Sequence, residues 1–331
     1  MKVKSKKKSK AKIVIAVILV LLICLDVFAA YYKSNPSSII KYETTNNHIS
    51  SNGKTKISAH RSGGGIAPEE SMMAFKNCIE NESFNVDIFE FDLHITKDEE
   101  LILLHDDTLD RTTDSEEVFG VKKARPEDYT YDELRKLNIG AKFVTDSGEA
   151  PYKDLHGDEV SDDLRIVKLD DILDYLISQG DFDYVIEIKN GGELGKKAVD
   201  ILCEKLKERN LFENVVFGTF KEEISEYVDE KHPELKRSAG IKEVLSFVGA
   251  ALINKNDFES NYISLIIPFN MPYRLIVNLG TARIINYAHK NNIAVQYWTI
   301  NKESEFEYLS SVSADCIMSD YPDKLYKTVN E

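Results

Sequence analysis

The chain has 331 residues and carries 42 Lys and Arg against 56 Asp and Glu side chains, a formal net charge of −14. Residues 1–32 hold seven lysines and one acid, so residues 33–331 carry a formal charge of −20. Such an acidic body repels nucleic acid at long range, which argues against a nucleic-acid partner and is compatible with a bound cation. The length suffices for one large barrel domain or two medium domains. The four cysteines, Cys24, Cys78, Cys203 and Cys316, form no Cys-x-x-Cys or zinc-ligand pattern and are expected to be free thiols.

The N-terminus predicts a membrane anchor. Residues 1–12 are a lysine-rich tail, and residues 13–32 are mostly apolar and about long enough to cross a bilayer. Lysines ahead of such a span favour a cytoplasmic tail and an extracytoplasmic body at the cell membrane. The alternative is a secretory signal cleaved near Ala29, which would release a secreted protein. We favour the uncleaved single-pass anchor because the apolar run continues to Tyr32.

A linker and one alternating domain follow. Residues 33–54 are rich in Ser, Asn and Thr, typical of a linker, and residues 55–327 alternate strand and helix patterns. We expect strands at 56–60, 86–95, 184–189, 214–219, 262–268, 294–299 and 316–319, with a weak one at 237–240. We expect helices at 70–80, 169–178, 194–210, 221–231, 281–291 and 303–311. Eight parallel strands with intervening helices favour a (β/α)8 TIM-type barrel over a doubly wound sheet, because no Gly-x-Gly-x-x-Gly follows the first strand.

Two segments interrupt this alternation. The gap between residues 86–95 and the apolar residues 101–105 is too short for a crossover helix, so we expect a hairpin that turns near Asp98. Residues 110–167 are too many for an ordinary loop and predict an inserted cap over the catalytic end, with one helix at 126–137.

Reactive side chains gather at the ends of the first strands. Alternation points Glu90 and Asp92 to the same face, where two buried carboxylates are costly unless a cation lies between them. Ca²⁺ and Mg²⁺ prefer such oxygen ligands. The hairpin places His105 roughly opposite Asp92, while His60 ends the first strand and Arg61 offers a planar fork for phosphate. Together these residues predict phosphoryl chemistry with one acid and one base.

The motifs also occur in a familiar order. They are His60-Arg61, Gly63-Gly64-Gly65, Ala67-Pro68-Glu69, Glu90-x-Asp92, His105-Asp106-x-x-Leu109-x-Arg111-Thr112-Thr113, Glu187-x-Lys189, Trp298-Thr299-Ile300-Asn301 and Ser319-Asp320-Tyr321-Pro322. This set resembles the glycerophosphodiester phosphodiesterases over about residues 56–327. The chain departs from the family in having Ser62 where the family has a glycine, and Glu70-Ser71 where it has Asn-Thr.

The resemblance implies hydrolysis of glycerophosphodiesters, or of related phospholipid-derived substrates, to glycerol 3-phosphate and an alcohol, with one divalent cation, Ca²⁺ or Mg²⁺. The attacking group is water or the glycerol hydroxyl, the latter through a cyclic phosphate. The implied site comprises His60 and His105 as acid and base in either order, Glu90, Asp92 and Glu187 as metal ligands, and Arg61, Lys189 and Trp298 around the substrate. An ordinary ion pair with Glu187 is the competing role for Lys189, and core packing is that for Trp298.

Two other functions stay open. One is a phospholipase C- or D-like phosphodiesterase barrel that acts on lyso-lipids or on glycerophosphate polymers. The other is a catalytically inactive, membrane-tethered binding module, against which the retention of both His60 and His105 argues.

Overall fold

The computed structural model describes residues 17–18, 21–22, 39–50, 53–269 and 278–330, and its centre is a parallel sheet curved into a barrel. Hydrogen bonds connect the strands in the order β5-β4-β2-β1-β8-β7-β6. The strands are β1 (Lys56–Ala59), β2 (Ile88–Ile95), β4 (Asp183–Ile188), β5 (Val215–Gly218), β6 (Ser264–Pro268), β7 (Ala294–Trp298) and β8 (Cys316–Ser319). Each lies within about two residues of its expected position, and the barrel prediction is confirmed.

The eighth position of the barrel is filled by residues 237–239 without a regular strand. Arg237 pairs in parallel with Phe217 of β5, and Ser238 pairs with Ser264 of β6. Two further backbone bonds, from Ser238 N to Phe217 O and from Ala239 N to Ser264 O, span 2.8 and 2.9 Å. The weak strand expected at 237–240 is therefore a pair of bridges that nearly closes the barrel.

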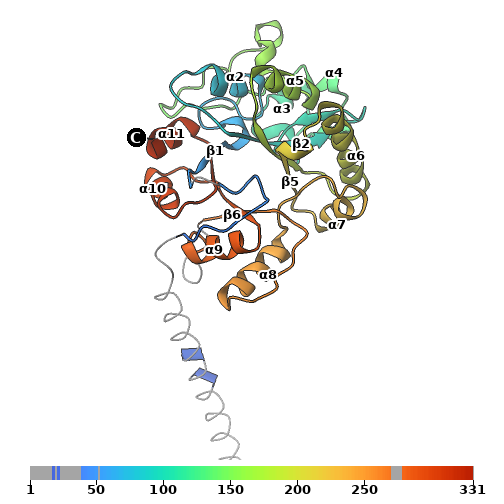
Figure 1. Cartoon of the computed structure of the whole chain (residues 1–331). Coiled ribbons are helices and arrows are strands. Elements are labelled where there is room, and N and C mark those ends of the chain that lie inside the picture. Colours follow the sequence, from blue (N-terminus) through green and yellow to red (C-terminus); the bar gives the residue numbers. More distant parts are fainter. Residues whose placement is uncertain (1–16, 19–20, 23–38, 51–52, 270–277, 331) are drawn as a thin grey trace, which may run out of the picture.

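A ring of helices surrounds the strands (Figure 1). They are α2 (Met72–Glu80), α5 (Leu169–Gln179), α6 (Gly192–Arg209), α7 (Glu222–Lys231), α8 (Ile241–Leu252), α9 (Ala282–Lys290), α10 (Glu303–Ser311) and α11 (Pro322–Asn330). The sequence did not predict α8 or α11. Helix α2 begins at Met72 because the side chain of Ser71 accepts a hydrogen bond from Ala74 N and caps the helix.

Inside the barrel, a layer of apolar side chains is followed by carboxylates toward the C-terminal ends of the strands. Ile88 and Val185 belong to a buried interior cluster with Val216, Cys316 and Met318. Two residues further along β2 and β4, the side chains on the same face are Glu90 and Glu187. The end of the barrel that carries chemistry in this fold is thus the polar end.

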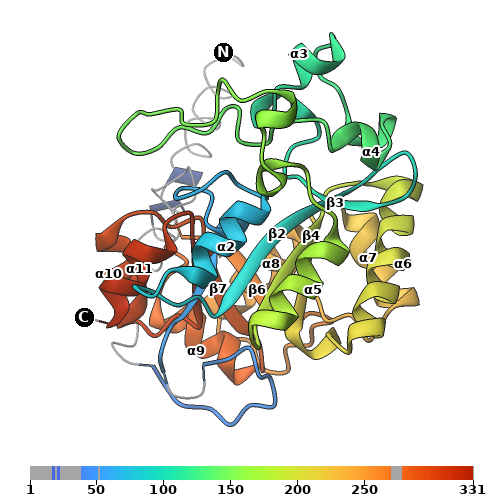
Figure 2. The same cartoon turned by 90° about the horizontal axis from the view of Figure 1, so that it is seen from above.

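The expected hairpin and cap sit at this same end. β2 pairs antiparallel with β3 (Leu101–Leu103), which confirms the hairpin. The inserted segment includes α3 (Ser115–Phe119) and α4 (Tyr131–Leu134), which lie together at one end of the barrel (Figure 2). The single helix expected at 126–137 is wrong: a short 3₁₀ turn, Pro126–Asp128, precedes α4, and the extended backbone of Thr130 separates them to form a capping box.

Residues 39–50 cross the opposite end of the barrel (Figure 2). Asn46, His48 and Ile49 are buried there. The Asn46 amide donates to the backbone carbonyls of Ile263 and Asn292, at 2.7 and 3.0 Å. Part of the segment expected to be a linker therefore packs against the barrel.

The predicted anchor at residues 13–32 lies almost entirely outside the described residues, and it stays a prediction. Among the residues that are described, no helix has both the length and the apolar character needed to span a bilayer. Cys78, Cys203 and Cys316 are free and buried, as expected, while Cys24 also falls outside the described part of the chain.

Candidate active site

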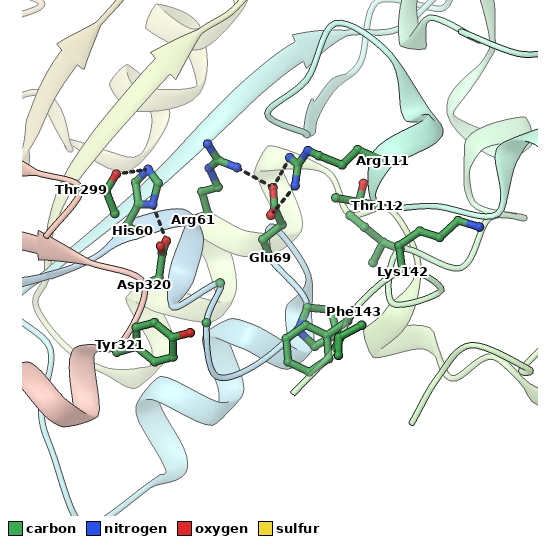
Figure 3. Close-up of a pocket in the computed structure, with 15 residues that line it drawn as sticks. His60, Arg61, Glu69, Arg111, Thr112, Lys142, Phe143, Thr299, Asp320 and Tyr321 are labelled. Atoms are coloured by element: carbon green, nitrogen blue, oxygen red, sulfur yellow. Dashed lines mark hydrogen bonds and ion pairs between the residues drawn. The ribbon is translucent and has the colours of Figure 1, made fainter. Parts of the chain in front are cut away.

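His60 follows β1 directly and is oriented by a carboxylate from the neighbouring strand. Ala59 pairs with Ser319 of β8, so the next residues, His60 and Asp320, emerge side by side. His60 Nδ1 lies 2.6 Å from Asp320 Oδ1, and its Nε2 faces Thr299 Oγ1 at 3.4 Å (Figure 3). Burial opposes protonation of His60, but the carboxylates of Glu90 and Asp320 outweigh burial and raise its pKa.

Three carboxylates lie at the floor of the cavity that His60 enters. Glu90 and Asp92 share one face of β2, and Glu187 of β4 is in register with Asp92. Burial, reinforced by the charge of Asp92, raises the pKa of both Glu90 and Glu187 to about 7. The pKa of Asp92 is lowered despite complete burial, because Lys189 and His105 stabilise its charge. The floor therefore holds more negative charge than its neighbours neutralise.

Lys189 is the counter-charge within this group. Its Nζ lies 2.9 Å from Asp92 Oδ1 and 2.8 Å from Glu187 Oε1. The ion pair that competed with phosphate binding for Lys189 is thus present in this structure. Burial disfavours the ammonium, but Asp92 and Glu187 outweigh it and raise the pKa of Lys189 above its usual range.

These carboxylates offer hard oxygen donors of the kind that Ca²⁺ and Mg²⁺ prefer. Asp92 Oδ2 is buried without a hydrogen-bond donor, as expected for an oxygen kept for another ligand. As placed, no three or more His, Cys, Asp or Glu side chains within the described ranges could jointly hold a metal ion. The Lys189 ammonium takes the space between Asp92 and Glu187, so a cation would have to replace it there.

His105 reaches the same cavity from the hairpin, one residue out of the expected register. Leu104, not His105, is opposite Asp92, as the Leu104 N to Asp92 O bond of 3.0 Å shows. His105 Nδ1 lies 2.6 Å from Asp106 Oδ1. Burial lowers the pKa of His105 by more than the Asp92 carboxylate raises it. His60, His105 and the three carboxylates line one cavity of about 320 Å³.

A chain of ion pairs connects the two histidine regions. Arg61 donates to Glu69 at 3.1 Å, and Glu69 also accepts two bonds from Arg111 at 2.7 and 2.8 Å (Figure 3). Arg111 binds Asp106 through two more bonds, at 2.6 and 2.9 Å. Such bidentate pairs fix orientation as well as charge, so Arg111 holds the carboxylate that orients His105.

Sequence reasoning missed the roles of Asp320, Asp106, Arg111 and Glu69, although each stood within a quoted motif. The helix expected from residue 70 would have placed Glu69 immediately before its first turn. Because α2 begins at Met72, the Glu69 carboxylate is free to bridge Arg61 and Arg111.

The two departures from the family pattern occupy left-handed backbone. Ser62 has φ +62° and Glu70 has φ +59°, conformations that glycine and asparagine, the family's residues, adopt most readily. Glu70 is buried, and its Oε1 accepts a hydrogen bond from Asp92 N at 3.1 Å. At both positions this chain therefore has a residue less suited to left-handed backbone than glycine or asparagine.

Trp298 forms part of the cavity wall. Its indole nitrogen donates to Ile266 O at 3.1 Å, and its ring lies 5.8 Å from that of Phe220. The same cavity is lined by Trp298 and by the carboxylates. The side chain therefore borders the site rather than the layer between barrel and helices.

Comparisons with known proteins find relatives with the same barrel fold and identify the family of this chain. The model of the glycerophosphoryl diester phosphodiesterase family matches residues 60–324. A glycerophosphodiester phosphodiesterase of Caldanaerobacter subterraneus subsp. tengcongensis is 28% identical over 282 residues, covering 84% of this chain and 99% of that protein. A lysophospholipase D of Mus musculus is 24% identical, with 82% and 85% covered. The structure of an Oleispira antarctica phosphodiesterase in complex with the product sn-glycerol-3-phosphate superposes with a TM-score of 0.62 at 18% identity, covering 84% of this chain and 98% of that one.

The matched residues extend from His60, the first histidine of the cavity, past Asp320, the carboxylate that orients it. The match also includes the hairpin and the inserted cap. With four-fifths of its length matched, the chain belongs to the glycerophosphoryl diester phosphodiesterase family and is a phosphoric diester hydrolase.

Proposed function

We propose that the protein hydrolyses glycerophosphodiesters to glycerol 3-phosphate and an alcohol, with His60 and His105 as the acid–base pair. This proposal rests on the similar hydrogen bonding of the two imidazole rings. Each Nδ1 lies 2.6 Å from an aspartate oxygen, Asp320 in one case and Asp106 in the other. A carboxylate only accepts, so each Nδ1 keeps its proton and each Nε2 exchanges one.

In this mechanism one histidine takes a proton from the attacking water or glycerol hydroxyl. The other donates a proton to the leaving alkoxide as the phosphorus–oxygen bond breaks. Arg61 and Lys189, the cations beside the carboxylates, would bind phosphate oxygens.

We further propose that Glu90, Asp92 and Glu187 hold one divalent cation, Ca²⁺ or Mg²⁺. Burial beside Asp92 raises the pKa of Glu90 and of Glu187. These raised pKa values support the proposal, because they indicate that the three carboxylates lack a neutralising positive charge. When bound, the cation would neutralise phosphate charge and orient the diester. Isothermal calorimetry on EDTA-stripped protein tests this directly, and an absence of heat with either cation would reject the site.

The roles of the histidines separate with two substrates. Alanine at His60 or His105 should lower kcat on glycerophosphocholine by about 10²–10⁴-fold, while His156→Ala, in the exposed cap, should not. A p-nitrophenyl leaving group needs no protonation by an acid. On a glycerophosphodiester with this leaving group, only the variant without the histidine that acts as the acid should regain kcat. Full turnover by both variants would reject the mechanism. Wild-type binding without turnover, with cation supplied, would favour the binding-module function.

We also propose a single-pass cell-membrane address with the barrel outside the cytoplasm. It rests on the lysines of residues 1–12 and the apolar residues 13–32. Protease treatment of intact cells should digest the barrel, and carbonate washing should leave it with the membranes. Recovery from the medium, shortened at its N-terminus, would indicate signal cleavage instead.

A further inference from the structure

A second cavity, of about 550 Å³, meets the catalytic cavity at His60 and is bounded by two different parts of the chain. The rim of the barrel supplies one side, which includes Arg61 and Tyr321. The inserted cap supplies the other side through three consecutive residues, 142–144, of which Lys142 and Phe143 are labelled in Figure 3. A group bound in this cavity would therefore lie between the barrel and the cap.

On the cap side, residues 142–151 form a loop that leaves the cap and returns to it at a fixed base. The buried side chain of Asn138 holds that base, because its amide donates to the backbone carbonyls of Tyr152 and Leu155 at 2.8 and 3.1 Å. No residue of the loop itself is buried, and most of them are exposed. Segments with few buried contacts open most readily in a folded protein, so this loop can move on its base.

The tip of the loop is attached to the barrel through Asp146. Its Oδ1 accepts a hydrogen bond from the Tyr321 hydroxyl at 3.0 Å, and its Oδ2 accepts one from Lys324 Nζ at 2.7 Å. Lys324 belongs to the first turn of α11, and its ammonium also lies 3.9 Å from the centre of the Tyr321 ring. The loop is thus held across the second cavity by one carboxylate.

The barrel side of this attachment is fixed in place. A methyl group added at Gly65 would come within 2.7 Å of the Tyr321 ring, so the ring packs directly against Gly65. Tyr321 also follows Asp320, the carboxylate that orients His60. The barrel residues of the attachment therefore cannot move far, and any opening has to come from the loop.

The attachment at Asp146 is weak enough to break and reform. The side chain of Asp146 is 60% exposed and that of Lys324 is 40% exposed. Ion pairs this exposed favour the paired state by about fivefold or less, because water and salt screen the two charges. Loops that close over an active site and reopen during turnover need such a weak attachment.

We infer that residues 142–151 are a lid over the second cavity, which Asp146 closes by binding Tyr321 and Lys324. The inference rests on the proposed function, because the group beneath the lid would be one substituent of the phosphodiester at His60. The lid opens to admit that substituent, closes while His60 exchanges its proton, and opens again to release the product that carries the substituent.

A reversible crosslink between the lid and the barrel tests this inference. In the full-length variant Asp146→Cys/Lys324→Cys, a short bis-methanethiosulfonate reagent ties the loop tip to α11. With cation present, kcat on glycerophosphocholine should fall by about tenfold or more on crosslinking and return with dithiothreitol. Cys78, Cys203 and Cys316 are buried, and the single variant Lys324→Cys, treated in the same way, measures any reaction at native cysteines.

A crosslink at another ion pair provides the matched control. Lys76 of α2 and Asp163, near the end of the inserted segment, lie 2.9 Å apart, and both side chains are 36% exposed. In Lys76→Cys/Asp163→Cys the same reagent ties the cap to the barrel but leaves the loop free, so kcat should not change. Equal inhibition by both crosslinks would overturn the lid in favour of a movement of the whole cap.

Proteolysis tests the attachment without catalysis. Trypsin should cut at Lys142 or Lys153, which flank the loop and are exposed, up to about fivefold faster in Asp146→Asn than in the wild type. The variant Asp146→Glu keeps the carboxylate and should be cut at the wild-type rate. Equal cleavage of the wild type and Asp146→Asn would overturn the role of Asp146 in holding the loop.

The outcomes separate the lid from the function on which it rests. Unchanged kcat in the crosslinked lid variant would overturn the inference and leave hydrolysis of glycerophosphodiesters standing. If the uncrosslinked protein hydrolyses no glycerophosphodiester, the proposed function fails, whereas the rates of tryptic cleavage still decide whether Asp146 closes the loop.

Discussion

Replacing Asp320 by asparagine should disable His60 while preserving the shape of the site. Asp320 Oδ2 accepts from the Asn301 amide at 2.6 Å, and its Oδ1 faces His60 Nδ1 at 2.6 Å. An asparagine that keeps its oxygen toward Asn301 turns its amide toward His60. Nδ1 must then accept, and the neutral ring carries its proton on Nε2, where it can no longer take one. We expect kcat to fall by about 10²–10⁴-fold.

The same change should shift the pH profile in a defined direction. The carboxylates of Asp320 and Glu90 raise the pKa of His60 against the effect of burial. Losing a hydrogen bond to a charged group removes about 1.5–3 kcal/mol, which corresponds to about one to two pKa units. Whether His60 is acid or base, its limb of the pH–rate profile should therefore move to lower pH.

The assay is the pH dependence of kcat on glycerophosphocholine at saturating cation for the wild type and the Asp320→Asn variant. The matched control is Asp200→Asn, which alters another aspartate–histidine pair, with His232 at 2.7 Å, outside the cavity. The control should retain its rate and profile. An Asp320→Asn enzyme with unchanged kcat and unchanged limbs would refute the idea that Asp320 orients a proton-exchanging His60.

Three further changes test other parts of the structure. Glu187→Gln should weaken cation binding by more than about tenfold in calorimetry, because a neutral amide replaces one of three carboxylates; unchanged affinity would remove Glu187 from the ligand set. Arg111→Lys should lower kcat by about tenfold or more with little change in the urea midpoint, since an ammonium cannot bind Glu69 and Asp106 bidentately at once; a normal kcat would show that this bridge is dispensable. Asn46→Ala should lower the free energy of unfolding by about 1–3 kcal/mol in urea titrations, because two backbone carbonyls lose their buried donor. The change lies at the far end of the barrel, so kcat should not change, and an unaltered urea midpoint would contradict the packing seen for residues 39–50.

The strands and their faces could be read from the sequence because they depend on local pattern. Alternation along β2 places Glu90 and Asp92 on the interior face, as expected. The hairpin followed from a gap too short for a helix. Helix α8 was not predicted, although its apolar residues recur at helical spacing along residues 241–252.

Pairings across the barrel were not predictable in the same way. His60 and Asp320 are 260 residues apart in sequence and become neighbours only because β1 pairs with β8. Likewise, the place of Lys189 between two carboxylates depends on the register of β2 with β4. The register of the hairpin differs by one residue from the expected register, so Leu104, rather than His105, lies opposite Asp92.

The alternating fold, the order of the motifs and the residue types that chemistry at phosphate requires can all be read from the amino-acid sequence. The aspartate that orients each histidine, the arginine that connects Glu69 to Asp106 and the apolar residues that border the site became known from the folded chain. The physical reason is that strand pattern and helix capping act over a few residues, whereas these contacts arise when the barrel closes and brings distant strand ends to one rim.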